Sequence, residues 1–243
     1  MGGDIQALTR NCIKNFILRI DLNGDMPVDE ITRCLKDDFI RMETRKVAGF
    51  TMNLDTRGLQ HIPAVSREES EEFYFVKSET NVMSILPKQN AIIINAKSYI
   101  SNEEYKATID KLAQVCSQAE ARRIGLRYVN VFACAKQGPI SAVFNAQFAA
   151  ALRGLMKSTM VNRAICVQSR KTSDDYICNV QFGLPNEGYP DIIRKFDLLL
   201  DIDSFVVGGI RGGDWVSVVS GLNHAAYDVF REIVTIRKIE EMQ

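Results

Sequence analysis

The chain of 243 residues is long enough for one large domain or two intimately packed halves, and its composition, 46% apolar and 25% charged, is that of an ordinary globular protein. Thirty basic residues balance thirty acidic ones, which excludes a global field that would draw the protein onto nucleic acid or an anionic membrane. No apolar run approaches the roughly 18 residues of a membrane span, and the first residues carry no signal-peptide pattern, so we expect a cytoplasmic protein.

The number and spacing of the cysteines and histidines disfavour a disulfide scaffold, a zinc site and cysteine–histidine catalysis. The six cysteines contain no Cys-x-x-Cys pair and lie in apolar segments, so we interpret them as buried thiols in a reducing compartment. His61 and His224 are the two histidines of the sequence. Two histidines provide few ligands for a zinc site and few bases for a cysteine–histidine pair, so we expect no cofactor.

The first half of the chain is predicted to have the order strand, helix, four strands, helix. Alternation of apolar and polar residues predicts strands at 15–22, 47–54, 73–77, 82–86 and 91–97. Apolar residues at helical spacing predict one helix from Pro27 and another from the capping box at 101–104 to about Ala121. The polar segment 57–71 is predicted to be a surface loop.

The second half has a similar order of elements. The patterns predict strands at 123–134, 161–169, 176–183 and 196–206, a helix near 144–152 and a long last helix from about 215. A glycine-rich segment, 208–213, precedes the last helix. We interpret it as a hinge or loop tip; the alternative is a phosphate-binding loop, although the segment has no Walker or dinucleotide motif.

The two halves align with one another. The apolar stripe of the first helix recurs at 144–152, an offset of 113 residues. The strand 91–99 recurs at 197–205, an offset of 106, and Arg19 recurs as Arg127, an offset of 108. Offsets that drift by a few residues are expected when the loops of two copies differ in length. The alternative is that any α+β chain shows such coincidences by chance.

We therefore predict an α+β fold in which an internally duplicated strand–helix–strands–helix unit forms one curved antiparallel sheet with helices on one face. The first unit covers residues 1–121 and the second 122–243, and the two pack as one globular body. This arrangement resembles the saddle of TATA-binding-protein-type folds in topology alone.

The central segment 125–130, Gly-Leu-Arg-Tyr-Val-Asn, resembles the Gly-Leu-Arg-Tyr-x-Asn signature of a sporadically distributed prokaryotic family with no established biochemical role. Three further segments are similar to that family: the strand 15–22, the helix entry 99–105 and a late Leu-Asn-His224 helix. After Phe230 the chain departs from the family, because Arg-Glu-Ile-Val replaces acidic and serine residues. The resemblance implies the fold and a link to mobile defence-type loci, but no reaction.

Four charged residues form the candidate site. Alternation along strand 123–132 places Arg127 opposite the larger apolar residues, and the repeat places Arg19 on the same face, close to Arg127. Asp201 and Asp203 share one face of strand 196–206. We weigh three interpretations: a structural ion-pair network, a polar cup for an anionic ligand or peptide, and a Mg²⁺ site built from the Asp-x-Asp pair.

His224 lies on the opposite side of the last helix from Trp215, outside the apolar stripe. It is predicted either to face solvent or to contact a second subunit. No sequence motif indicates a serine or cysteine nucleophile near His224, which disfavours a role for His224 as a catalytic base.

The predicted function is that of a binding or interaction module that forms a homodimer. Another interpretation is an antitoxin or sensor whose partner protein is encoded by a neighbouring gene. The alternative is a Mg²⁺-dependent phosphoryl-transfer or nuclease enzyme that uses the Asp201–Asp203 pair. Nucleic-acid binding is disfavoured, because arginines and aspartates cancel on the face that would hold it.

Overall fold

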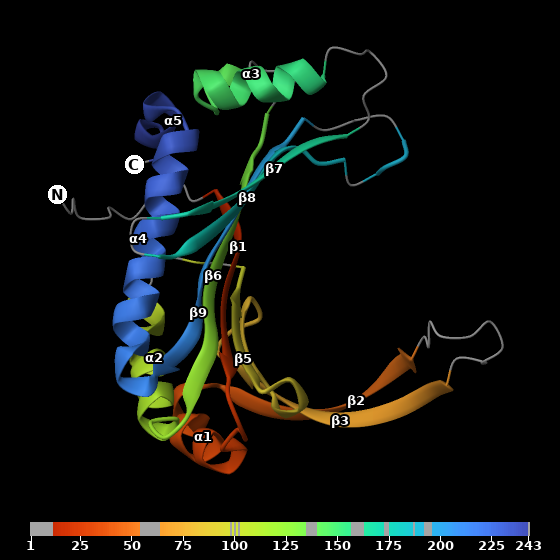
Figure 1. Cartoon of the computed structure of the whole chain (residues 1–243), viewed down its shortest axis with the longest axis vertical. Helices are drawn as coiled ribbons and strands as arrows, with labels where there is room; N and C mark the ends of the chain where they lie inside the picture. Colours follow the sequence, from red (N-terminus) through yellow and green to blue (C-terminus); the bar gives the residue numbers. More distant parts are fainter. Residues whose placement is uncertain are drawn as a thin grey trace.

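The computed structural model describes residues 12–53, 64–97, 99, 101, 103–134, 140–156, 163–172, 175–186, 188–191 and 196–242. These residues form one sheet and a set of helices (Figure 1). The strands are β1 (Ile13–Leu22), β2 (Arg41–Asn53), β3 (Ala64–Val76), β4 (Asn81–Leu86), β5 (Ala91–Ala96), β6 (Glu120–Phe132), β7 (Ala164–Lys171), β8 (Ile177–Leu184) and β9 (Leu198–Arg211). The α-helices are α1 (Val28–Leu35), α2 (Glu103–Val115), α3 (Ala146–Leu155), α4 (Trp215–Ile233) and α5 (Ile236–Glu240).

The nine described strands belong to one sheet in the order β2-β3-β4-β5-β1-β6-β9-β8-β7, and each pair of neighbours is antiparallel. β1 and β6 lie side by side near the middle, with Leu18 opposite Leu126. The prediction of an α+β fold with one continuous antiparallel sheet is confirmed. β2 and β3 extend beyond the rest of the sheet on its helix-free side, so that this side is concave (Figure 1).

One face of the sheet carries the core. Along β1 the residues Phe16, Leu18, Ile20 and Leu22 are fully buried, and the matching positions of the other central strands continue this apolar layer. The helices α2 and α4 cover it (Figure 1), and Trp215 at the start of α4 is fully buried. The opposite face carries no helix in the part of the chain that the structure describes. None of the described helices is long and apolar enough to cross a membrane.

The segment predicted as a surface loop, 57–71, is partly a strand. β3 begins at Ala64 and pairs along its whole length with β2, while residues 54–63 lie outside the described residues. Polar residues on both faces hid this strand from a search for apolar alternation. Opposite charges face each other across the ladder instead, Lys46 against Glu71 and Arg45 against Glu72, and such pairs stabilise a ribbon exposed to solvent.

The glycine-rich segment is not a loop. Its first four residues, 208–211, belong to β9, and Gly212–Asp214 form a short 3₁₀ turn that leads directly into α4. A side chain on Gly209 would meet the carboxylate of Glu120, and one on Gly212 would lie 2.7 Å from a backbone oxygen of α2. These glycines allow close packing of backbone against neighbouring elements, which corrects the prediction of a hinge or phosphate loop.

Candidate functional site

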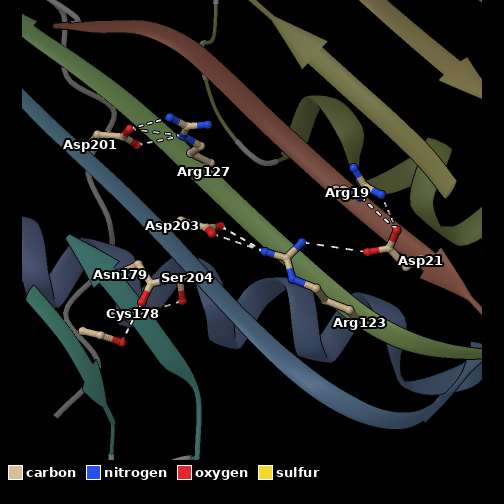
Figure 2. Close-up of polar contacts among 10 residues, drawn as sticks. Arg19, Asp21, Arg123, Arg127, Cys178, Asn179, Asp201, Asp203 and Ser204 are labelled. Atoms are coloured by element: carbon tan, nitrogen blue, oxygen red, sulfur yellow. Dashed lines mark hydrogen bonds and ion pairs between the residues drawn. The ribbon is translucent and has the colours of Figure 1, made fainter. Parts of the chain in front are cut away.

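Six charged side chains gather on the helix-free face of the three middle strands, and we call them the central polar cluster (Figure 2). They are Arg19 and Asp21 of β1, Arg123 and Arg127 of β6, and Asp201 and Asp203 of β9. The four residues predicted from the sequence all belong to this cluster. All six have the same strand parity as Gly125, which places them opposite the buried apolar layer.

Arg127 and Asp201 form a two-pronged ion pair. The Nε of Arg127 lies 2.9 Å from Oδ1 of Asp201, and its Nη2 lies 2.6 Å from Oδ2. The Asp201 side chain is only 7% exposed, whereas that of Arg127 is 46% exposed. The hydrogen bonds to Asp201 raise the pKa of the Arg127 guanidinium. Among the described residues the Nη1 group of Arg127 has no partner, so one edge of the guanidinium faces outward.

Arg19 and Asp21 repeat this arrangement within one strand. Both Nε and Nη2 of Arg19 contact Oδ1 of Asp21, at 2.9 and 2.8 Å. Asp21 is 7% exposed and Arg19 37% exposed. In the described part of the chain the Nη1 group of Arg19 is again unpartnered. Each arginine is thus fixed by a buried carboxylate on one edge and open on the other.

The prediction that Arg19 and Arg127 lie close together holds at the level of the backbone. In the β1–β6 ladder Arg19 is opposite Gly125 and Arg127 is opposite Ile17, so the two arginines occupy diagonal positions about the Leu18–Leu126 pair. Their side chains do not bond to one another; each turns to its own aspartate (Figure 2). The centre of the face therefore has two separate guanidinium groups rather than one shared pocket.

Arg123 connects the two ends of the cluster, and the sequence interpretation missed it. Its Nη2 lies 3.3 Å from Asp203 and its Nη1 4.0 Å from Asp21 (Figure 2). The guanidinium also stacks on Phe205, 4.6 Å from the ring centre. A signal for it was present, because Arg123 is four positions from Arg127 on the same strand and so shares its face.

Asp203 is an aspartate of the cluster whose pKa is shifted. Burial raises the pKa of its carboxyl group, against the opposing influence of Arg123 and Arg127. With every group ionised, three arginines and three aspartates cancel. A proton on Asp203 therefore leaves the cluster with one net positive charge, so the charge of this face depends on pH.

The arrangement of the carboxylates does not favour the predicted Mg²⁺ site. Asp201 and Asp203, the predicted Mg²⁺ pair, each engage a different arginine. No group of three or more His, Cys, Asp or Glu side chains suited to a metal ion occurs among the described residues. The six cysteines are free, and burial raises the pKa of Cys12 to about 12 and that of Cys116 to about 11, so these thiols are poor nucleophiles at neutral pH.

The segments on which the family resemblance rests converge on the helix side of the sheet. Tyr128 donates a hydrogen bond of 2.8 Å from its hydroxyl to Oδ1 of Asn223 on α4. Four aromatic rings pack together here, with centroids 4.6 to 6.4 Å apart. Phe16 and Tyr99 each contact the ring of Tyr128, and both also contact Tyr105 and one another. Burial raises the pKa of Tyr99 to about 12, so its hydroxyl stays protonated. These residues therefore join β1, β6, α2 and α4 into one core.

Asn130, the last residue of the central motif, is a backbone partner. It is buried, and its amide nitrogen donates to the carbonyl oxygen of Leu200 at 3.0 Å. Its amide oxygen accepts from the thiol of Cys12 at 3.2 Å. Asn130 thus links β6 to β9 and to the start of β1, next to the irregular register between Ile13 and Asn15.

His224 is exposed on α4, and its Nδ1 lies 2.8 Å from the backbone oxygen of Ser220, one helical turn earlier. This position agrees with the expected solvent-facing side of the helix. Contact with a second subunit through His224 stays a prediction.

The sequence matches no protein-family model and no curated protein sequence. The resemblance through the central motif therefore stays a prediction as well.

Proposed function

We propose that the chain is a non-catalytic binding module whose helix-free sheet face receives an anionic group. The observation that carries this proposal is the arrangement of Arg19 and Arg127, each held on one guanidinium edge by an aspartate that is 7% exposed while the other edge faces outward. A guanidinium has five N–H donors in a fixed fork, so one such group can bind an internal carboxylate and an external oxyanion together.

The internal carboxylates serve the binding by fixing the arginines in advance. An unrestrained arginine loses much side-chain freedom when it captures a ligand, and an arginine already oriented loses less. The aspartates also cancel the charge of the cluster, which lowers non-specific attraction to polyanions. The ligand class is a carboxylate or phosphate group, presented by a small molecule or by an acidic segment of a protein partner. A partner encoded by a neighbouring gene is one source of such a segment.

We infer further that the sheet is built from two copies of one unit, as predicted from the offsets. The register of the β1–β6 ladder supports this. Adding 108 to Phe16 and subtracting 108 from Tyr128 converts the pair Phe16–Tyr128 into the pair Ile124–Ile20, which is also a pair of the ladder. A two-fold axis through the Leu18–Leu126 pair relates such positions, and the saddle-like resemblance of the fold rests on this same axis.

The neighbouring strands fit the duplication with one adjustment. Arg19 is opposite Ile93 of β5 and Arg127 is opposite Asp203 of β9, which relates these strands by 203 − 93 = 110 residues rather than the predicted 106. In the strand order, β5, β4 and β3 follow β1 as β9, β8 and β7 follow β6. Among the described strands, β2 has no counterpart beyond β7. The boundary between 121 and 122 falls just inside the start of β6.

Titration with an oxyanion tests the proposed site. We expect inorganic phosphate, and more strongly a short glutamate-rich peptide, to shift the side-chain NMR signals of Arg19 and Arg127. Arg127→Ala should weaken binding at least about tenfold, the loss expected for one charge-assisted pair. Arg41→Ala is the matched control, because Arg41 lies on β2, is paired with Glu43 and is outside the cluster. Equal binding by both variants would refute the site.

A further inference from the structure

The strand β7 lies at one open end of the described sheet and is partly exposed. β7 ends the strand order, with β8 as its one neighbour among the described strands. Val167 is 69% exposed, and Gln168 and Ser169 beside it are also exposed. Successive side chains of a strand point to opposite faces, so three exposed residues in a row mean that neither face of this stretch is covered. Within the described part of the chain, no strand pairs with its outward backbone groups.

The two ends of the sheet differ in chemistry. β2, the strand at the other end, carries Arg41, Glu43, Arg45 and Lys46 within its first six residues. Charges of this kind are a usual protection of an edge strand against pairing. The first six residues of β7, Ala-Ile-Cys-Val-Gln-Ser, carry no charge. The β7 end thus lacks the protection that the β2 end has.

The chain itself contains an example of what fits such an edge. In the first half, β3 has β4 on one side and the 13-residue β2 on the other. β7, which the proposed duplication relates to β3, has a described strand, β8, on one side only. Residues 156–163 connect α3 to β7 and are too few to supply a strand as long as β2. Among the described residues no strand occupies the corresponding place beside β7.

We propose that a second copy of this chain fills it, with β7 pairing antiparallel to β7 of the other copy about a two-fold axis at Val167. In this register Ala164 is opposite Arg170, Ile165 opposite Ser169, and Val167 opposite its own counterpart. From Ala164 to Arg170 no like charges face each other, and two β-branched side chains meet at the axis; beyond this stretch Lys171 comes opposite Arg163, which limits the pairing to these seven residues. The axis has the same orientation to the sheet as the one proposed between β1 and β6, so the helices of both copies lie on one side.

The proposed dimer rests on the proposed duplication, because the pairing of β3 with β2 is the model for the pairing at β7. It does not depend on the proposed anion site. Pairing through one edge buries less surface than a standard protein interface, so association is weak and depends on concentration. A continuous sheet of two copies carries both central polar clusters on one face, which gives an acidic partner two places to bind at once.

Sedimentation analysis of the full chain from about 1 μM to 1 mM, the range that covers weak complexes, tests the dimer. We expect a reversible monomer–dimer equilibrium. Val167→Lys, which adds an edge charge, should raise the dimer Kd at least about tenfold. The control is Val207→Lys on β9, because Val207 is 63% exposed and β8 separates β9 from β7 in the strand order. Thermal melting establishes that both variants are folded.

Cross-linking tests the register. In a Cys166→Ser background, Val167→Cys should form an intermolecular disulfide on mild oxidation, because Cα atoms directly opposite in an antiparallel pair are about 4.5–5.5 Å apart. Val207→Cys should not. A wild-type chain that stays monomeric, equal dissociation of the two lysine variants, or a dimer without the cross-link each overturns the proposal. A monomer that still binds phosphate would leave the anion site standing.

Discussion

The guanidinium group of Arg123 lies directly over the α-carbon of Gly125. A side-chain carbon built on Gly125 would sit 2.9 Å from Nη2 of Arg123, closer than real contacts allow. Glycine at this position therefore makes the space in which Arg123 reaches from β6 to Asp203. The first residue of the central motif is thus tied to the polar cluster, while its tyrosine and asparagine serve the opposite face.

Gly125→Ala should displace the Arg123 side chain and lower the free energy of unfolding by about 0.5–1.5 kcal/mol. Because both changes break the same contacts, Gly125→Ala combined with Arg123→Ala should cost less than the sum of the single changes, with a coupling of about 0.5 kcal/mol or more. Denaturant unfolding of the four proteins measures this. Gly154→Ala is the control: its position in α3 is open, so alanine should stabilise the helix. Strict additivity would contradict the contact.

The two partners of the Arg127–Asp201 pair should respond differently to removal. Arg127→Ala leaves the buried carboxylate of Asp201 without its cation, and we expect a loss of about 1–3 kcal/mol. Asp201→Asn leaves a half-exposed guanidinium that water can solvate, so the loss should be smaller. Adding Asp201→Asn to Arg127→Ala should recover part of the stability. A larger effect for Asp201→Asn alone would show that the aspartate is not the more desolvated partner.

Tyr128→Phe should lower the free energy of unfolding by about 1–2 kcal/mol, because it leaves Oδ1 of Asn223 without its donor at the interface between sheet and α4. The exposed Tyr189 provides the control, since Tyr189→Phe should change stability by less than about 0.5 kcal/mol. Urea unfolding followed by circular dichroism compares them. Equal, small effects would mean that the Tyr128–Asn223 bond adds nothing to the fold.

Stability and anion binding should both depend on the protonation of Asp203. Its pKa is raised in the folded protein, so the folded state holds this proton more tightly than the unfolded chain does. The stability contribution is therefore fully present below the unfolded pKa and is lost as pH rises through the folded pKa. Asp203→Asn cannot ionise and should lack this loss, so its advantage over the wild type grows with pH.

Affinity for phosphate should rise in the wild type as pH falls through the folded pKa of Asp203, because the cluster gains a positive charge. Phosphate titrations at several pH values, compared between the wild type and Asp203→Asn, measure this step. The variant should lack it. A wild-type affinity that follows the variant at every pH would remove Asp203 from the site.

Many of the strands and helices could be predicted from the sequence, because the spacing of apolar residues within a short segment is enough to identify them. The alternation in β1 and β6 identified both strands and their buried faces, and it placed Arg19 and Arg127 on the opposite face. The second helix was predicted to run to about Ala121, but it ends at Val115, since Ala121 is already a fully buried residue of β6. Helix ends depend on tertiary contacts that no local pattern encodes.

The ion-pair partners within the central polar cluster could not be predicted from the sequence. Which aspartate an arginine takes depends on the register between strands distant in sequence. Arg127 is directly opposite Asp203 in the β6–β9 ladder, yet it bonds to Asp201, while Arg123 reaches Asp203 across Gly125. Alternation alone gives the face of a residue but neither its register nor its diagonal contacts.

The charges along β2 also set a limit on growth. A protein whose sheet could be extended at both ends would add copies head to tail without a natural stop, as fibrous aggregates do. Arg41, Glu43, Arg45 and Lys46 make one end of this sheet unsuited to that role. The proposed pairing through the remaining end then closes at two chains, and the charged β2 strands form the two outer ends of the combined sheet.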